Sequence, residues 1–186
     1  MSLPPWRPVL KAAQQRDGRS PSARWLQLAT VAKDGTPRVR TLVFRGWHGD
    51  DQLLLFTDGR SEKCEELNHQ PAAEVCWLFA KAKQQFRLRG VISRITPERD
   101  PALVRHCWGT MRDSGRALWA WPHPGAAFSS DALFADAVPE DTAPPDHFVV
   151  CLLAVAQVEL LDLTQHPHRR TRWALADLWR EHRLNP

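Results

Sequence analysis

The sequence contains no tyrosine, no long apolar run and no C-x-x-C pair. Its four cysteines are Cys64, Cys76, Cys107 and Cys151. Their spacing fits neither a zinc site nor a disulfide framework, so we expect reduced thiols that pack as small apolar side chains. No apolar segment approaches the ~20 residues that a membrane-spanning helix needs. We therefore expect no membrane association.

Residues 1–10 also lack the apolar centre of a signal peptide, since three of them are proline. This favours a cytoplasmic location. The length of 186 residues predicts a single domain over 1–186 that is large enough to bury a core. With 43% hydrophobic and 25% charged residues, the composition is typical of a soluble globular protein.

The chain is basic, with a formal net charge of +4 and a pI near 9.2. Its Lys and Arg residues form no long block, and several occur singly within strand-like segments. Neither an RNP-type aromatic strand nor a basic helix is present, so we expect no nucleic acid partner. The distribution favours a small phosphorylated ligand.

Tight turns divide most of the chain into strand-like segments. Strands are predicted over residues 25–32, 36–47, 52–57, 72–79, 84–95 and 147–163. Helices are predicted over residues 6–16, 61–69, 96–111 and 114–121. The tail over 169–186 fits neither pattern. Together these segments predict a mainly β fold with flanking helices, in which six antiparallel strands form a closed or partly closed barrel.

The segment 122–146 differs from the rest because it is acidic and rich in proline. It is longer than most loops that have no function of their own. Two interpretations are open at this point. The loop borders or covers a substrate site, or it is an irregular insert remote from any site.

Two clusters of residues are suited to phosphate. Arg40 and Arg45 lie five residues apart, which places them on opposite faces of a regular strand unless the strand bends or ends near Arg45. The segment 57–63 places Arg60, Ser61 and Lys63 around a predicted helix N-terminus, where free N–H groups and the helix dipole favour anions. An ordinary surface arginine and an ordinary capped helix are the alternatives.

Two further clusters lie in the second half of the chain. Gln85, Arg87 and Arg89 share one face of a predicted strand and line either a groove or the solvent. Residues 166–172 (HPHRRTR) could bind phosphate, metal or nucleic acid. No carboxylate or cysteine accompanies them at ligand spacing, so we expect no metal site. Hydrolase motifs such as G-x-S-x-G and H-E-x-x-H are absent.

Taken in order, several short motifs resemble those of pyridoxamine 5'-phosphate oxidases and of their FMN-binding relatives. The motifs are Gly35-Thr36-Pro37 with Arg40 and Arg45, Phe56-Thr57 with Ser61 and Lys63, Gln85-Phe86, Arg112-Asp113-Ser114, His168-Arg169-Arg170, and Arg183-Leu184-Asn185-Pro186. The resemblance covers the chain from about Trp25 to Pro186. It implies a six-stranded split β-barrel that works as a homodimer with two FMN molecules at the subunit interface.

The resemblance also implies roles for individual residues. FMN contacts are expected from Arg40, Thr41, Leu42, Val43, Arg45, Phe56, Thr57, Arg60, Ser61, Lys63, Gln85 and Arg170. Among these, Ser61 and Lys63 would hold the phosphate, and Gln85 would reach the isoalloxazine from the opposite subunit. A small-molecule substrate would meet Trp108, Arg112, Ser114, His166 and His168. No catalytic residue is assigned.

The sequence departs from the family pattern mainly on the substrate side. Glu62 stands where the family has arginine, with Arg60 as a nearby replacement, and Leu161 stands where it has tryptophan. His166 replaces a substrate-side arginine, and Trp108 lies near the place of an absent tyrosine. These changes favour an FMN-dependent oxidoreductase acting on an unidentified small substrate. A genuine pyridoxamine 5'-phosphate oxidase, and a flavin-binding or haem-binding protein without turnover, remain the alternatives.

Overall fold

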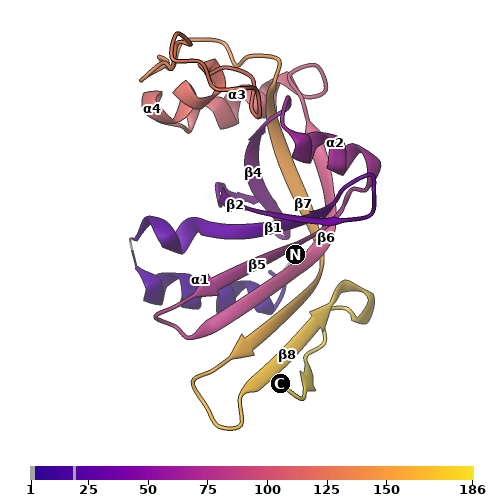
Figure 1. Cartoon of the computed structure of the whole chain (residues 1–186). Helices are drawn as coiled ribbons and strands as arrows, with labels where there is room; N and C mark the ends of the chain where they lie inside the picture. Colours follow the sequence, from indigo (N-terminus) through magenta and orange to yellow (C-terminus); the bar gives the residue numbers. More distant parts are fainter. Residues whose placement is uncertain (1–2, 19) are drawn as a thin grey trace.

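The computed structural model describes residues 3–18 and 20–186, which form one antiparallel sheet with helices around it (Figure 1). The strands are β1 (Trp25–Val31), β2 (Pro37–Val43), β3 (Gly46–His48), β4 (Gln52–Asp58), β5 (Ala72–Phe79), β6 (Gln84–Ile95), β7 (Phe148–Asp162), β8 (Arg169–Ala174) and β9 (His182–Leu184). The α-helices are α1 (Trp6–Asp17), α2 (Glu62–His69), α3 (Pro101–Gly109) and α4 (Asp113–Arg116). Short 3-10 turns lie at Pro21–Arg24, Ala117–Ala120 and Leu175–Asp177.

The predicted fold class is confirmed, since the protein is mainly antiparallel β with flanking helices. The described residues contain nine strands rather than the six expected. One extra strand arises because the predicted strand 36–47 is broken into β2 and β3. The other two come from the tail, where β8 pairs with β7 and β9 pairs with β8.

The sheet curls because its two ends are joined by only two residues. Its main order is β2-β1-β5-β6-β7-β4-β3, yet β2 and β3 are separated in the chain only by Phe44 and Arg45. The N–H of Phe44 donates to Arg24 O at 2.7 Å, and that of Arg45 donates to Leu54 O at 3.0 Å. The chain thus passes from one sheet edge to the other, although no strand pairing between β2 and β4 closes the sheet in the described chain. The expected break near Arg45 is confirmed.

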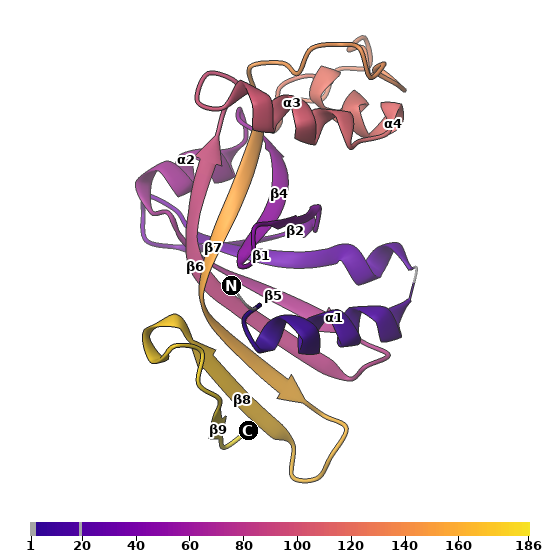
Figure 2. The same ribbon diagram turned by 180° about the vertical axis from the view of Figure 1, so that it is seen from behind.

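The long β6–β7 ribbon connects the two ends of the molecule (Figures 1 and 2). A β-bulge interrupts its register between Arg89 and Gly90. A Cβ atom at Gly90 would lie 2.0 Å from the carbonyl oxygen of Ala154, so no side chain fits there without moving the partner strand. The main core lies inside the curled sheet, around buried rings such as Trp77, Phe79 and Phe86.

Helix boundaries differ from the expected ones in two places. The predicted helix over 96–111 begins only at Pro101, because Asp100 is the N-cap and its carboxylate accepts a hydrogen bond from Leu103 N at 2.9 Å. The predicted helix over 114–121 is a short α4 followed by a 3-10 turn. Residues 122–146 contain no helix or strand, as predicted. None of the helices in the described part of the chain is long and apolar enough to cross a membrane.

Candidate functional site

A first pocket of about 230 Å³ lies where β2, β4 and the start of α2 meet the 3-10 turn Ala117–Ala120. Its walls are formed by Thr41, Leu42, Val43, Arg45, Phe56, Thr57, Asp58, Lys63, Leu118 and Trp119. Seven of these residues belong to the set expected to contact FMN. The sequence did not indicate Asp58, Leu118 and Trp119 as site residues. For Trp119 the only signal was an aromatic residue in a short predicted helix.

The cation nearest to the start of α2 is Lys63. Its Nζ donates to Thr57 Oγ1 at 2.9 Å and to Ser61 Oγ at 2.8 Å. Burial lowers the pKa of Lys63. Ser61 is the N-cap of α2, but its hydroxyl donates to Asp58 O at 2.6 Å and caps no helix N–H. Both hydroxyls next to Lys63 can therefore orient it toward the pocket.

A second cation, Arg45, lies on the opposite wall. Burial, together with the nearby positive charge of Arg24, lowers the pKa of Arg45. Its guanidinium carbon is 5.4 Å from the centroid of the Phe56 ring. In the part of the chain that the structure describes, neither Arg45 nor Lys63 forms an ion pair with a carboxylate. The pocket thus carries two partly buried positive charges without a direct ion pair in the described chain, and its one carboxylate, Asp58, is paired with Arg60.

Two other arginines expected to contact FMN are held by carboxylates and do not line this pocket. Arg40 Nη2 is 2.7 Å from Oε2 of the buried Glu66, and Arg40 Nη1 donates to Thr30 Oγ1. Arg60 Nη2 lies 2.6 Å from Asp58 Oδ2 and also donates to the carbonyl of Trp121 at 3.2 Å. Their contacts with FMN stay predictions.

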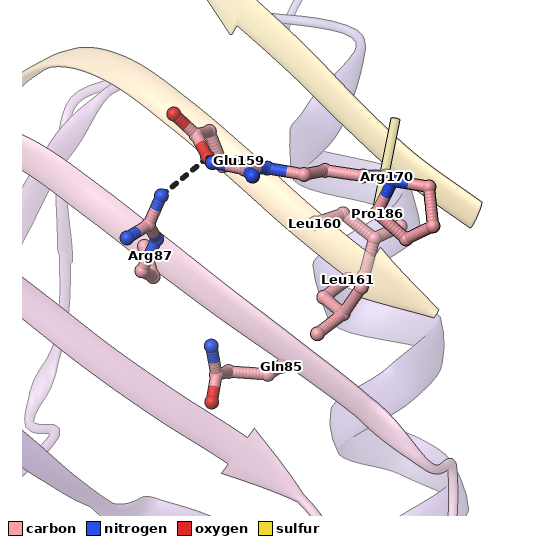
Figure 3. A pocket seen from close by; sticks show the side chains of 7 residues that line it. All are labelled: Gln85, Arg87, Glu159, Leu160, Leu161, Arg170 and Pro186. Carbon is pink, nitrogen blue, oxygen red and sulfur yellow. Dashed lines mark hydrogen bonds and ion pairs between the residues drawn. The ribbon is translucent and has the colours of Figure 1, made fainter. Parts of the chain in front are cut away.

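A second pocket of about 160 Å³ lies between β6, β7 and β8 (Figure 3). It brings together Gln85 and Arg170, both expected to contact FMN, with Arg87, Glu159, Leu160, Leu161 and Pro186. Arg170 Nη2 is 2.7 Å from Glu159 Oε2, which also accepts a hydrogen bond from Arg87. Burial alone would raise the pKa of Glu159, but these two arginines lower it. Glu159 was not predicted from the sequence.

The two pockets lie on different parts of the sheet. In the strand pairing, Thr57 of the first pocket is opposite Val149, and Arg170 of the second is opposite Leu161. Along a straight strand this separation would be up to about 40 Å. Figure 1 agrees, because β4 and β8 lie toward opposite ends of β7. The two pockets share no lining residue and are separate sites in one protomer.

The residues expected to contact substrate are also dispersed. Trp108 is only 2% exposed, packs against Trp119 and Phe148, and donates its indole N–H to Thr142 O at 2.7 Å. Its single donor is therefore already used. The other four are exposed, with Arg112 and Ser114 at the start of α4 and with His166 and His168 in the β7–β8 connection. One protomer does not bring these groups together.

A buried arginine that the sequence analysis missed fixes the segment between α3 and β7. Arg116 is 1% exposed, and its guanidinium donates to the carbonyls of Trp108, Met111 and Val138. It also pairs with the carboxylate of Asp113. These contacts tie the irregular loop to the helices beside the first pocket. Among the described residues, no group of three or more His, Cys, Asp or Glu side chains is placed to hold a metal ion.

The chain resembles known proteins over most of its length. The family model described as pyridoxamine 5'-phosphate oxidase, FMN-binding domain matches residues 3–96, which include both unpaired cations of the first pocket. Pyridoxine/pyridoxamine 5'-phosphate oxidase 2 of Arabidopsis thaliana is 31% identical over 165 residues, covering 86% of this chain and 83% of the relative. The match to the pyridoxine/pyridoxamine 5'-phosphate oxidase of Rhizobium johnstonii is also 31% identical, but spans 60% of this chain and half of that relative.

Solved structures give the same picture. A pyridoxamine 5'-phosphate oxidase-related, FMN binding protein from Nostoc punctiforme is 34% identical and superimposes with a TM-score of 0.93 over 100% of both chains. PhzG from Burkholderia lata, solved in complex with tetrahydrophenazine-1-carboxylic acid, has a TM-score of 0.78 over 98% of this chain and 94% of its own. At 20% identity, the likeness to PhzG shows the fold alone.

Proposed function

Because the chain belongs to the pyridoxamine 5'-phosphate oxidase FMN-binding family, we propose that it binds FMN and acts as an oxidoreductase on a small substrate. The observation that carries this proposal is the pair of cations in the first pocket. Burying a positive charge without a partner is costly, as the lowered pKa of Lys63 and of Arg45 indicates. A phosphate dianion would remove that cost, since it is stabilised by ammonium, guanidinium and hydroxyl donors together.

The remainder of the pocket suits a flavin. Leu42, Val43 and Phe56 supply an apolar wall, and Thr57 contributes a hydroxyl beside Lys63. Such a slot, with few polar groups, is typical of sites for large planar cofactors. When bound, the flavin would supply the electron-accepting ring, and the protein would bind and orient both reactants.

We further propose that the functional unit is a homodimer. Each pocket, at about 230 and 160 Å³, is smaller than the ~300–1,000 Å³ typical of ligand sites. The groups expected to contact one FMN are divided between them. A two-fold pair could join the first pocket of one copy to the Gln85 and Arg170 pocket of the other.

The proposal is tested by titrating purified protein with FMN, riboflavin and FAD, following quenching of flavin fluorescence. We expect FMN to bind most tightly, because riboflavin lacks the phosphate and no G-x-G-x-x-G motif is present for a dinucleotide. FAD or riboflavin binding as tightly as FMN would contradict the proposal. If the purified protein shows the absorption spectrum of haem, it is instead a haem-binding protein.

We expect Lys63→Ala to lower FMN affinity by about ten- to a hundredfold. A charge-assisted hydrogen bond to phosphate contributes about 1.5–3 kcal/mol, and the variant removes one such donor. Lys33→Ala is the matched control, because Lys33 is exposed in the β1–β2 turn. If Lys63→Ala has wild-type thermal stability and unchanged FMN affinity, the phosphate does not bind at Lys63.

The shared site predicts complementation between two defective variants. Lys63→Ala and Gln85→Ala alter different pockets, so a heterodimer would contain one intact site and one doubly altered site. After random exchange of subunits, roughly a quarter of all sites should bind FMN with wild-type affinity. Light scattering should give twice the chain mass of 21.2 kDa. No recovery in the mixture, or a monomer mass for the FMN-loaded protein, would reject the shared site.

A further inference from the structure

A third pocket, of about 300 Å³, lies within the irregular loop next to the first one. Its rings are Trp121, Phe128 and Phe134, and its other walls are Leu118, Pro122, His123, Pro124, Gly125, Ala126, Ala127, Ser129 and Ala132. The ring centroids of Phe128 and Phe134 are 6.2 Å apart with 22° between the planes, and Trp121 meets Phe134 edge-on at 5.6 Å. The pocket is thus lined mainly by aromatic and small apolar side chains.

The loop pocket adjoins the candidate flavin pocket. Leu118 lines both of them, and the neighbouring Trp119 lines the first and donates its indole N–H to Thr57 O at 3.2 Å. Arg60 holds the carbonyl of Trp121, and the indole N–H of Trp121 donates to Ala135 O at 2.9 Å. The bonds from Trp119 to Thr57 and from Arg60 to Trp121 fix the start of the loop against the end of β4 and the turn before α2.

The charge of the loop determines which ligands it accepts. Residues 122–146 contain five carboxylates and no lysine or arginine. A phosphorylated ligand would find no lysine or arginine among the lining residues, and the net negative charge of the loop would disfavour it. An aromatic ring without an anionic group would be held by the three rings, which pack favourably edge-to-face or offset-stacked.

Taking FMN binding in the first pocket as given, we propose that the loop pocket is the substrate site and that it accepts a planar aromatic compound without a phosphate group. The proposal gives the loop the bordering role that its length and composition suggested, with Leu118 as the boundary between cofactor and substrate. Its exposed rings distinguish it from the core, since Phe128 is 83% and Phe134 is 46% exposed. Alanine at either position therefore leaves the folded core intact.

The test compares 2-naphthol with 2-naphthyl phosphate by equilibrium dialysis against the FMN-loaded protein. The two probes share one ring system and differ by the phosphate. We expect 2-naphthol to bind at least about tenfold more tightly, and to shift the visible absorption of the flavin because the two pockets adjoin. Equal or tighter binding of 2-naphthyl phosphate would overturn the proposal.

Variants then locate the probe. Phe128→Ala combined with Phe134→Ala should weaken 2-naphthol binding by about tenfold, equivalent to about 1.4 kcal/mol, and leave FMN affinity unchanged. Leu133→Ala is the matched control, because Leu133 is 87% exposed in the same loop and does not line the pocket. Equal effects in both variants, or none in either, would overturn the assignment.

Two other outcomes separate this proposal from its premise. If wild-type protein binds no FMN, the proposed function fails, while dialysis of 2-naphthol against the same protein still reports on the loop pocket. If the double phenylalanine variant instead changes the mass measured by light scattering, the rings contact a second copy of the chain and the substrate assignment is wrong.

Discussion

The FMN-loaded protein is expected to oxidise pyridoxamine 5'-phosphate about a thousandfold less efficiently than a pyridoxamine 5'-phosphate oxidase assayed beside it. The substrate phosphate would have lost two donors. Trp108 is buried and its indole N–H is already bonded to Thr142. His166 stands in place of an arginine, and an imidazole lacks the permanent charge and the forked donors of a guanidinium. At about 1.5–3 kcal/mol for each lost donor, the two losses together reach roughly this factor.

The measurement is pyridoxal 5'-phosphate formation under air, with reduction and reoxidation of the bound flavin as a check that the cofactor is competent. His166→Arg should recover about tenfold in efficiency, because it restores a permanent charge. His69→Arg, at an exposed position at the end of α2, is the control for added charge. An efficiency equal to that of the reference enzyme would show that Arg112 and Ser114 suffice to bind the phosphate.

Replacing Arg116 by alanine is expected to lower the free energy of unfolding by about 3–5 kcal/mol. The variant would leave the buried carbonyls of Trp108, Met111 and Val138 without their donor, and each unsatisfied group costs about 1–3 kcal/mol. It would also open a cavity in one of the largest fully buried side-chain sites of the protein. Relaxation of the loop toward water limits the total, because freed carbonyls near the surface can be hydrated.

Urea unfolding followed by tryptophan fluorescence measures this loss, with Arg105→Ala as the control. Arg105 is exposed on α3, so its removal should change stability by less than about 0.5 kcal/mol. Equal stability of the two variants would show that Arg116 is replaceable by solvent. If the free energy of unfolding falls by less than this and protease cleaves the variant faster only within 122–146, the effect of Arg116 is limited to the loop.

The strands and turns of the first half of the chain could be predicted because their patterns are local. Alternation along Gln84–Ile95 places Gln85 and Arg87 on the more accessible face, as expected. The tail could not be assigned because β8 is a strand only through its pairing with β7, and β9 only through its pairing with β8. Arg116 was not predicted as buried for a similar reason. A charged residue in a short helix is expected at the surface, and the carbonyls that it binds cannot be identified from the sequence.

The candidate site was predictable in part. Residues clustered in sequence, such as Phe56, Thr57 and Lys63, do meet in one pocket. Pairings across the fold were not visible from spacing, and so neither the Glu66 partner of Arg40 nor the bond from Trp108 to Thr142 was foreseen. Sequence patterns identify residue types suited to a ligand, but not which of them the protein already uses for itself.

The bulge at Gly90 divides the β6–β7 ribbon into two arms with different registers. One arm carries the pairing with β4 and hence the cationic pocket, and the other carries Gln85 and the pairing with β8. Between the arms, the backbone at Gly90 passes too close to Ala154 for any side chain. If two copies share their sites, this bulge helps to fix the distance between the two cofactors of the dimer. The methyl group of a Gly90→Ala variant would then misalign both sites at once.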